Sequence, residues 1–273
     1  MKLIIKETFV TIRRSFKRFI SILLIVLLGV GFFAGIKATS PDMESTINDY
    51  YKKTKFQDIE LLSTWGITEE EINILNEKEY ISEGYYSFDA IIKTDIEEVV
   101  KVLSYNKDNQ LNKLNLVSGK LPEHENECVI DAKNNHNHKI GDVITVQSDN
   151  LFVKELKIVG MVKSPIYTSL ERGTTELLTG TINYFLYVSE DNFNMDYYTN
   201  VGVYLDEEMY SEEYTEKLSK VKEELEVLTE EFKEERYLLE KNRALNEYND
   251  ALNTFEKEKK STLNKINKAK NEI

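Results

Sequence analysis

The chain has 273 residues with 48 acidic and 35 basic side chains, a formal net charge of -13. Residues 1–18 hold six Lys or Arg against one Glu, a net charge of +5, so the rest of the chain carries a net charge of -18. Because phosphate backbones attract basic surfaces, this acidic majority argues against a nucleic-acid partner. The lone cysteine, Cys128, permits no internal disulfide, so an external domain must rely on its own apolar core.

Residues 1–18 are basic and have apolar side chains at helical spacing. Lys and Arg accumulate on the cytoplasmic side of membranes, so the basic residues before the following apolar run predict a cytoplasmic N-terminus. The residues that set this topology are Arg13, Arg14, Lys17 and Arg18. Two interpretations of the segment remain open: an amphipathic helix in the membrane interface, or the ordinary basic flank of a membrane helix.

Residues 19–36, from Phe19 to Ile36, form an uncharged apolar run. As a helix the run is about 27 Å long, close to the roughly 30 Å of a bilayer's hydrocarbon core. It predicts a transmembrane helix in a cell membrane, with the main domain after Lys37 extracytoplasmic. One alternative is a buried core helix, which seldom has a basic cluster at one end. The other is a cleavable signal peptide, although Ile36 and Lys37 interrupt the small-x-small cleavage pattern.

Residues 41–206 are predicted to form a mixed α+β domain outside the cytoplasm. A helix is expected to continue over residues 42–56, and Thr68 followed by Glu71 predicts the start of another helix. Alternating apolar side chains separated by turn residues predict many short strands, which favours an α+β fold. These strands are expected at residues 58–63, 85–93, 99–105, 114–117, 128–130, 143–146, 152–162, 184–188 and 201–205.

Residues 211–273 contain no Gly or Pro and are rich in Glu, Lys, Leu and Asn. This composition predicts one long helix, because nothing near residues 241–249 favours the reversal of a hairpin. Its apolar side chains alternate in steps of four and three, the spacing of a coiled-coil seam, at Leu218, Val221, Leu225, Leu228 and Phe232. We expect the second helix that covers this seam to be missing or to come from another chain. A solvated single helix held by charge pairs is the alternative.

The sequence contains no motif for enzymatic chemistry, so we expect no enzyme activity and no cofactor. The segment from Gly173 to Thr181 has six residues between its glycines and lacks the lysine of a nucleotide-binding loop. Trp65 is expected to pack beneath the turn before Thr68, with ligand stacking as the alternative. Four zinc-type donors lie close together, but their spacing matches no standard site and no metal is expected; they are His124, Cys128, His136 and His138.

Three short motifs follow one another along the predicted domain. They are the turn from Gly119 to Pro122, the Gly141-Asp142 turn after an apolar residue, and a strand in which Gly160 follows a valine. With the N-terminal membrane helix, they make residues 1–206 resemble FtsX-like ABC transporter permeases and their MacB-like external core domain. The resemblance implies a permease that pairs with a separate cytoplasmic ATPase, whose motion is passed through the membrane to the external domain.

The same resemblance implies further partners. Some members of the family insert a long coiled-coil hairpin into the external domain, and residues 211–273 would be its ascending arm. Members have at least four membrane helices, so we expect this chain to be the N-terminal part of a longer permease. Further permease helices or a second coiled-coil helix would then be its partners. Two other functions remain open: a single-pass adaptor of the membrane-fusion type, and a ligand-sensing ectodomain with a coiled-coil stalk.

Overall fold

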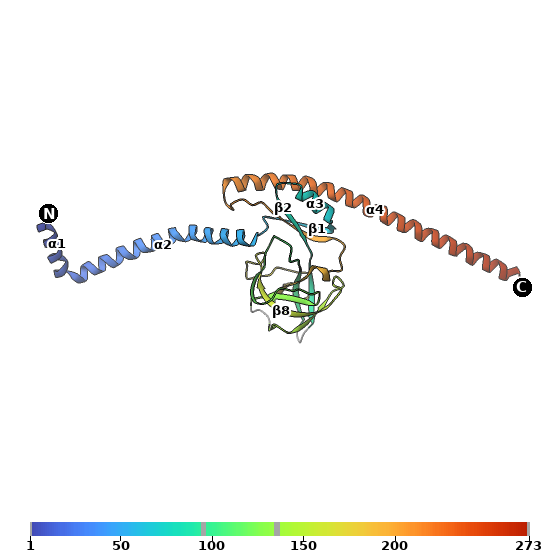
Figure 1. Ribbon diagram of the computed structural model, residues 1–273, viewed down its shortest axis with the longest axis horizontal. Helices are drawn as coiled ribbons and strands as arrows, with labels where there is room; N and C mark the ends of the chain where they lie inside the picture. Colours follow the sequence, from blue (N-terminus) through green and yellow to red (C-terminus); the bar gives the residue numbers. More distant parts are fainter. Residues whose placement is uncertain (1, 94–96, 134–136, 272–273) are drawn as a thin grey trace. The chain divides into compact units, whose positions relative to one another are not determined.

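The computed structural model describes residues 2–93, 97–133 and 137–271 (Figure 1). By their internal contacts they form two compact units, Met1–Lys55 and Phe56–Ile273. The fold is mixed α+β, with an apolar helix near the N-terminus and a long helix at the C-terminal end, as the sequence predicts.

The described residues of the first unit form two helices. α1 (Lys2–Arg14) is separated by Ser15 from α2 (Phe16–Thr54), which contains the predicted span and continues through Pro41. Among the described helices, α2 is long and apolar enough to cross a membrane, and none of its apolar window is buried. This exposure argues against the alternative of a core helix. The four basic residues proposed to set the topology are all exposed at the junction of α1 and α2.

The described residues of the second unit form two sheets, two α-helices and a short 3-10 helix. The helices are α3 (Glu69–Asn76), η1 (Glu190–Asn192) and α4 (Glu212–Asn271). The strands are β1 (Ile59–Ile67), β2 (Ile81–Tyr85), β3 (Ser87–Lys93), β4 (Glu97–Tyr105), β5 (Asn115–Gly119), β6 (Glu127–Asp131), β7 (Val143–Gln147), β8 (Glu155–Lys163), β9 (Tyr184–Ser189) and β10 (Tyr198–Tyr204).

The larger sheet closes on itself. Its strand order is β5-β8-β6-β9-β4-β3-β7, and β7 also pairs with β8. β7 occupies the first part of one edge of β8 and β5 the second part, while β6 runs along the other edge. In the described residues β8, β6, β9, β4, β3 and β7 therefore form a closed six-stranded ring. Alternate side chains fill its interior, among them Ile92, Val102, Ile130, Ile144, Leu156 and Leu186.

The smaller sheet has the order β1-β10-β2 and packs against α3 and α4. The start of α3 is confirmed as a capping box. The Thr68 hydroxyl accepts a hydrogen bond from the Glu71 amide at 3.1 Å, and the Glu71 carboxylate accepts one from the Thr68 amide at 2.6 Å. This reciprocal pair satisfies backbone donors that the first turn of a helix otherwise leaves open.

Strand β2 is absent from the sequence-based prediction, which treats Gly84 as the turn that opens a strand at residue 85. In the structure Gly84 lies inside β2, opposite Val201 of β10. A Cβ there would lie 2.5 Å from the Ile72 side chain and 2.6 Å from the Tyr198 ring. Glycine is needed here because α3 and Tyr198 pack closely against this strand. From the sequence alone, a glycine required by close packing looks the same as a glycine in a turn.

Helix α4 is continuous over its described residues, which confirms the prediction of one long helix. The structure differs from the prediction in what covers the seam. Val221 and Leu225 are buried, and Leu218, Leu228 and Phe232 are partly buried, against a cluster from α3, β1 and β10. The chain's own small sheet thus covers this half of the seam, and no second helix is needed there. Helical periodicity reveals an apolar face, but it does not reveal what lies against that face.

Beyond Arg236 the apolar side chains of α4 are exposed. They are Tyr237, Leu238, Leu239, Leu245, Tyr248, Leu252, Phe255, Leu263 and Ile266. Figure 1 shows α4 beside α3 and β1 and then continuing past them. The helix therefore has a docked half and a half whose apolar side chains are exposed to solvent.

The core of the small sheet predicts an alkaline transition that depends on Tyr80. Burial, with a smaller contribution from Glu224, raises the pKa of Tyr80 to about 12. Its stabilising contribution is present below about pH 10, where tyrosines in the unfolded chain also keep their protons, and is lost as the pH rises toward 12. We expect Tyr80→Phe to reduce this loss, measured by urea unfolding on both sides of about pH 10.

The same substitution should cost little at neutral pH. The Tyr80 hydroxyl is buried with no hydrogen-bond partner among the described residues, so its removal leaves no group unpaired. Equal losses of stability at alkaline pH in the variant and the wild type would contradict the assignment.

Candidate functional site

The three motif turns of the sequence converge on strand β8. Gly119 of β5 stands directly opposite Gly160 of β8, and the Lys120 amide donates to the Val159 carbonyl at 3.0 Å. On the neighbouring stretch, the Gly141 amide donates to the Ile158 carbonyl at 2.8 Å, and the Ile158 amide donates to the Asp142 carbonyl at 2.9 Å. Motifs that lie far apart in the chain thus form one cluster of turns.

Glycine is required at two of these positions because backbones approach closely. Gly119 has a φ of +80°, and a Cβ on it would lie 2.2 Å from the Val159 carbonyl oxygen. A Cβ on Gly160 would lie 2.3 Å from the Lys120 carbonyl oxygen. Gly141 also has a positive φ, but the space around it is open. The motifs are therefore explained by strand packing and turn geometry, and Pro122, buried beside them, belongs to the same structural cluster.

A buried ion pair that the sequence does not reveal anchors the loop before β9. The Arg172 guanidinium donates from Nε to Asp131 Oδ2 at 2.6 Å and from Nη2 to Asp131 Oδ1 at 3.1 Å. Both side chains are at most 5% exposed. The guanidinium also lies over the Tyr167 and Phe185 rings and donates to the Ser169 carbonyl at 2.6 Å. No sequence motif marks this pair, because its partners come from distant parts of the chain.

The four zinc-type donors do not form a metal site in the part of the chain that is described. Cys128 lies inside the closed ring and is fully buried, which raises the pKa of its thiol. The His138 Nε2 lies 2.8 Å from the Tyr184 hydroxyl and 3.1 Å from a Glu98 oxygen. His124 instead lies near two carboxylates, and His136 is outside the described residues.

The two glutamates beside His124 form ion pairs with a lysine of the same chain. Glu123, His124 and Glu127 place one ligand atom each within 4.8 Å of one another. However, the Lys120 ammonium lies 3.1 Å from Glu123 and 3.0 Å from Glu127, and Glu127 also accepts the Glu123 amide at 2.9 Å. The position where a cation would be attracted is thus taken by the chain's own ammonium group.

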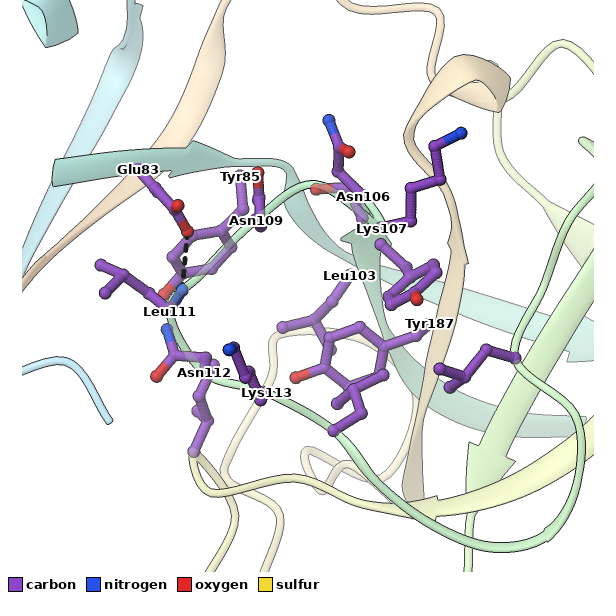
Figure 2. A pocket seen from close by; sticks show the side chains of 15 residues that line it. Glu83, Tyr85, Leu103, Asn106, Lys107, Asn109, Leu111, Asn112, Lys113 and Tyr187 are labelled. Carbon is purple, nitrogen blue, oxygen red and sulfur yellow. Dashed lines mark hydrogen bonds between the residues drawn. The ribbon is translucent and has the colours of Figure 1, made fainter. Parts of the chain in front are cut away.

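A small cavity lies between the outer face of the ring and residues 105–114 (Figure 2). Its volume is about 250 Å³. Leu103, Leu114 and the Tyr187 ring provide apolar walls. The Glu83 carboxylate accepts hydrogen bonds from the backbone amides of Gln110 at 2.7 Å and Leu111 at 2.8 Å, and it thereby holds the loop over the cavity.

Most polar groups near this cavity are already hydrogen-bonded to other groups of the protein. The Tyr85 hydroxyl donates to Glu60 at 2.5 Å, and the Tyr187 hydroxyl lies 2.8 Å from the Ser164 hydroxyl. Lys107 and Lys113 are exposed at the cavity, whereas Glu83 is engaged by two amides. These charges favour anions, and the volume is below that of a site for a drug-sized ligand.

A larger groove lies between β1 and the end of the docked half of α4. Its volume is about 860 Å³, and we name it the β1–α4 groove. The residues that define it are Leu62, Trp65, Glu71, Phe232, Arg236 and Tyr237. Leu62 is 74% exposed and Trp65 is 52% exposed. The prediction that Trp65 packs beneath a turn is therefore wrong. Trp65 lies in the irregular part of β1 between Leu62 and Ile67, and its side chain is about half exposed.

One side of the groove is fixed by a clasp between α4 and α3. Arg236 Nη2 lies 3.2 Å from Glu71 Oε2, and its guanidinium is 4.3 Å from the centre of the Tyr197 ring. Glu71 is also the residue that completes the capping box of α3. A second contact joins Lys78 Nζ to Glu224 Oε1 at 2.8 Å. The groove thus has a rigid wall of paired charges beside exposed aromatic side chains.

Part of this chain is similar to a solved structure. No protein-family profile matches the chain, and nothing among curated proteins matches it. The solved structure is the extracellular domain of a noncanonical ABC-type transporter, YknZ, from Gram-positive bacteria. The identity is 14% and the TM-score 0.36, over 53% of this chain and 76% of that one. A likeness at this TM-score carries no conclusion for this chain.

Proposed function

We propose that this chain is the permease component, or its N-terminal part, of an ABC transporter of the FtsX/MacB type. Its observed basis is the uncharged run from Phe19 to Ile36, which lies within a helix whose apolar window has no buried residue and follows a basic flank. In a bilayer these side chains would face lipid or other membrane helices. The α+β unit that follows contains the motif turns on which the resemblance rests.

In this proposal the chain is not an enzyme and has no cofactor of its own. A cytoplasmic ATPase hydrolyses ATP, and α1 and α2 transmit its motion to the external unit. The basic N-terminal end lies in the cytoplasm, where Arg13, Arg14, Lys17 and Arg18 hold it. The exposed half of α4 pairs with a second coiled-coil helix, because its row of apolar side chains has the spacing of a seam.

The membrane-fusion adaptor is the second candidate. Such an adaptor needs two antiparallel helical arms, and α4, from Glu212 to Asn271, would supply one of them. A sensor with a stalk is less suited to this order of elements. Its stalk would lie between membrane and domain, whereas α4 follows the last strand of the domain.

The orientation can be tested with single introduced cysteines. The native thiol of Cys128 is fully buried and its pKa is raised by burial, so it should remain unlabelled. We expect a membrane-impermeant maleimide to label Leu170→Cys on intact cells, because Leu170 is 76% exposed in the second unit. Thr8→Cys, exposed on α1, should be labelled only after the cells are opened.

The pairing with an ATPase needs its own measurement. The tagged chain, co-expressed with ABC-type ATPases of the same genome, should retain one of them through purification in mild detergent. Labelling of Thr8→Cys from outside would overturn the orientation. Loss of the N-terminal segment from the mature protein would favour the signal peptide. If the chain retains no ATPase, the proposal of a permease is wrong.

A further inference from the structure

The β1–α4 groove has the composition of a recognition surface. Trp, Tyr and Arg dominate the energetics of protein interfaces, and the groove holds Trp65, Tyr237 and Arg236 together with the apolar Leu62 and Phe232. Leu62 and Trp65 are both more than half exposed on the same strand. Large apolar side chains gathered in this way on a soluble surface mark contact sites.

The backbone of β1 favours an extended occupant. β1 pairs regularly with β10 from Ile59 to Leu62, and no other strand of the described residues pairs with it. A strand at a sheet edge presents amide and carbonyl groups that can accept one more strand. α4 forms the opposite wall, so a segment lying between them would bond to β1 and pack on Phe232 and Tyr237. Peptides that add to a sheet edge use main-chain bonds for affinity and side-chain pockets for selectivity.

The charge of the α4 wall favours a basic occupant. Five glutamates of α4 lie around one shallow hollow on this helix: Glu223, Glu226, Glu230, Glu231 and Glu234. Two of them, Glu230 and Glu234, also line the groove. Lys233 is engaged by Glu230 at 3.0 Å, and Arg236 is engaged by Glu71. Both basic side chains of the groove are thus committed to carboxylates, and the wall holds more glutamates than these two pairs use. Lys or Arg in the occupant would complement that excess.

We propose that the β1–α4 groove binds an extended segment of a partner protein, apolar with Lys or Arg side chains, as an added strand beside β1. The apolar side chains of the segment pack on Trp65, Phe232 and Tyr237, and its basic side chains face the glutamates of α4. This binding depends on the groove alone and is expected whether or not the chain pairs with an ATPase.

The chain supplies its own reporter, because Trp65 is its single tryptophan. The probe is a blocked heptapeptide of alternating Val and Lys, added to the full chain in nanodiscs of zwitterionic lipid. We expect a saturable blue shift of the tryptophan emission as the indole leaves water. The same peptide with Glu in place of Lys should bind at least about tenfold more weakly. A version with Pro at two central positions should also bind weakly, since Pro lacks the amide that a ladder requires.

Two variants localise the binding. Leu62→Lys should abolish the saturable shift, and the 74% exposure of Leu62 means that the fold tolerates lysine there. Leu116→Lys is the matched control, an exposed leucine on edge strand β5 outside the groove, and it should bind like the wild type. The double variant Glu230→Gln, Glu234→Gln should reduce the preference for the Lys peptide over the Glu peptide.

Four results would overturn the proposal. The first is tighter binding of a helical Leu/Lys peptide, which would make the occupant a helix. The second is equal binding of the Pro version, which would remove the added strand. A shift that appears with protein concentration alone would assign the groove to a second copy of the chain. The fourth result is that none of these peptides shifts the emission, which would show that the groove does not bind the proposed segment.

Discussion

Replacing Arg172 with alanine is expected to lower the free energy of unfolding by about 3 to 5 kcal/mol. The substitution removes the guanidinium from the Asp131 carboxylate, which is 4% exposed at the end of β6; the Lys133 amide still donates to that carboxylate at 3.0 Å. A buried charge that loses its opposite charge keeps the cost of leaving water but loses the attraction that offset it. The stacking on Tyr167 and Phe185 is lost as well.

Urea unfolding of the full chain in micelles, followed by tryptophan fluorescence and circular dichroism, measures this loss. Arg243→Ala is the matched control, because Arg243 pairs with Glu247 on exposed α4 and should change stability by less than about 1 kcal/mol. The double variant Asp131→Leu, Arg172→Met should recover much of the loss, since a buried pair can be exchanged for apolar groups. Equal effects of Arg172→Ala and Arg243→Ala would refute the role of the pair.

Gly119→Ala is expected to be nearly as damaging, at about 2 to 5 kcal/mol. Two costs add: a non-glycine residue must adopt a φ of +80°, and its Cβ meets the Val159 carbonyl oxygen 2.2 Å away. The atom that it meets belongs to the backbone of β8 and cannot move aside as a flexible side chain can. Strands β5 and β8 would have to separate where Gly119 faces Gly160.

Gly141→Ala separates the two costs. Gly141 has a φ of +102°, but no atom lies within 4 Å of its added Cβ, so this variant measures backbone strain alone. We expect it to lose about 1 to 2 kcal/mol. Gly160→Ala should show the other cost alone, since Gly160 has no positive φ but its Cβ would lie 2.3 Å from the Lys120 carbonyl oxygen. If Gly119→Ala cost no more than Gly141→Ala, close approach of the backbones would not explain the motif.

Local patterns predicted much of the fold. The capping box at Thr68, the alternation of Phe88, Ala90 and Ile92, and the absence of Gly and Pro after residue 211 each depend on neighbours within one element. The apolar run before Lys37 also needed no tertiary information, since its length and lack of charge suffice. Such features survive folding because tertiary packing reinforces them.

Features that join distant residues were not predictable. The closure of the ring depends on β7 reaching β8, and the buried pair depends on Arg172 meeting Asp131. Trp65 lies in an irregular part of β1, where the Ser63 hydroxyl accepts from the Trp65 amide and donates to the Gly66 carbonyl. In each case the sequence shows the residue type but not the partner, and the partner decides whether a polar or aromatic side chain is buried.

The candidate sites were less predictable than the fold. The motif glycines were identified, and the structure explains them as packing positions. The β1–α4 groove was not anticipated, because its two walls come from distant parts of the second unit's sequence. The seam of α4 was expected to be covered by a helix that is missing or comes from another chain. The many glutamates of α4 are apparent in the sequence. Which of them line the groove depends on the face by which α4 packs against the small sheet.

The pairing of the strands also sets the order in which the domain can form. Ile59 pairs with Val203, and Val100 pairs in parallel with Tyr184. The small sheet therefore cannot assemble until the chain has been synthesised through β10. β4 can pair early with β3 on one side, but its other side must wait for β9. Proteins dominated by such long-range pairings fold slowly, on the order of milliseconds to seconds. During synthesis β1 and β2 would stay unpaired until β10 follows, and unpaired strands are prone to aggregation, so the nascent chain is a natural substrate for folding helpers.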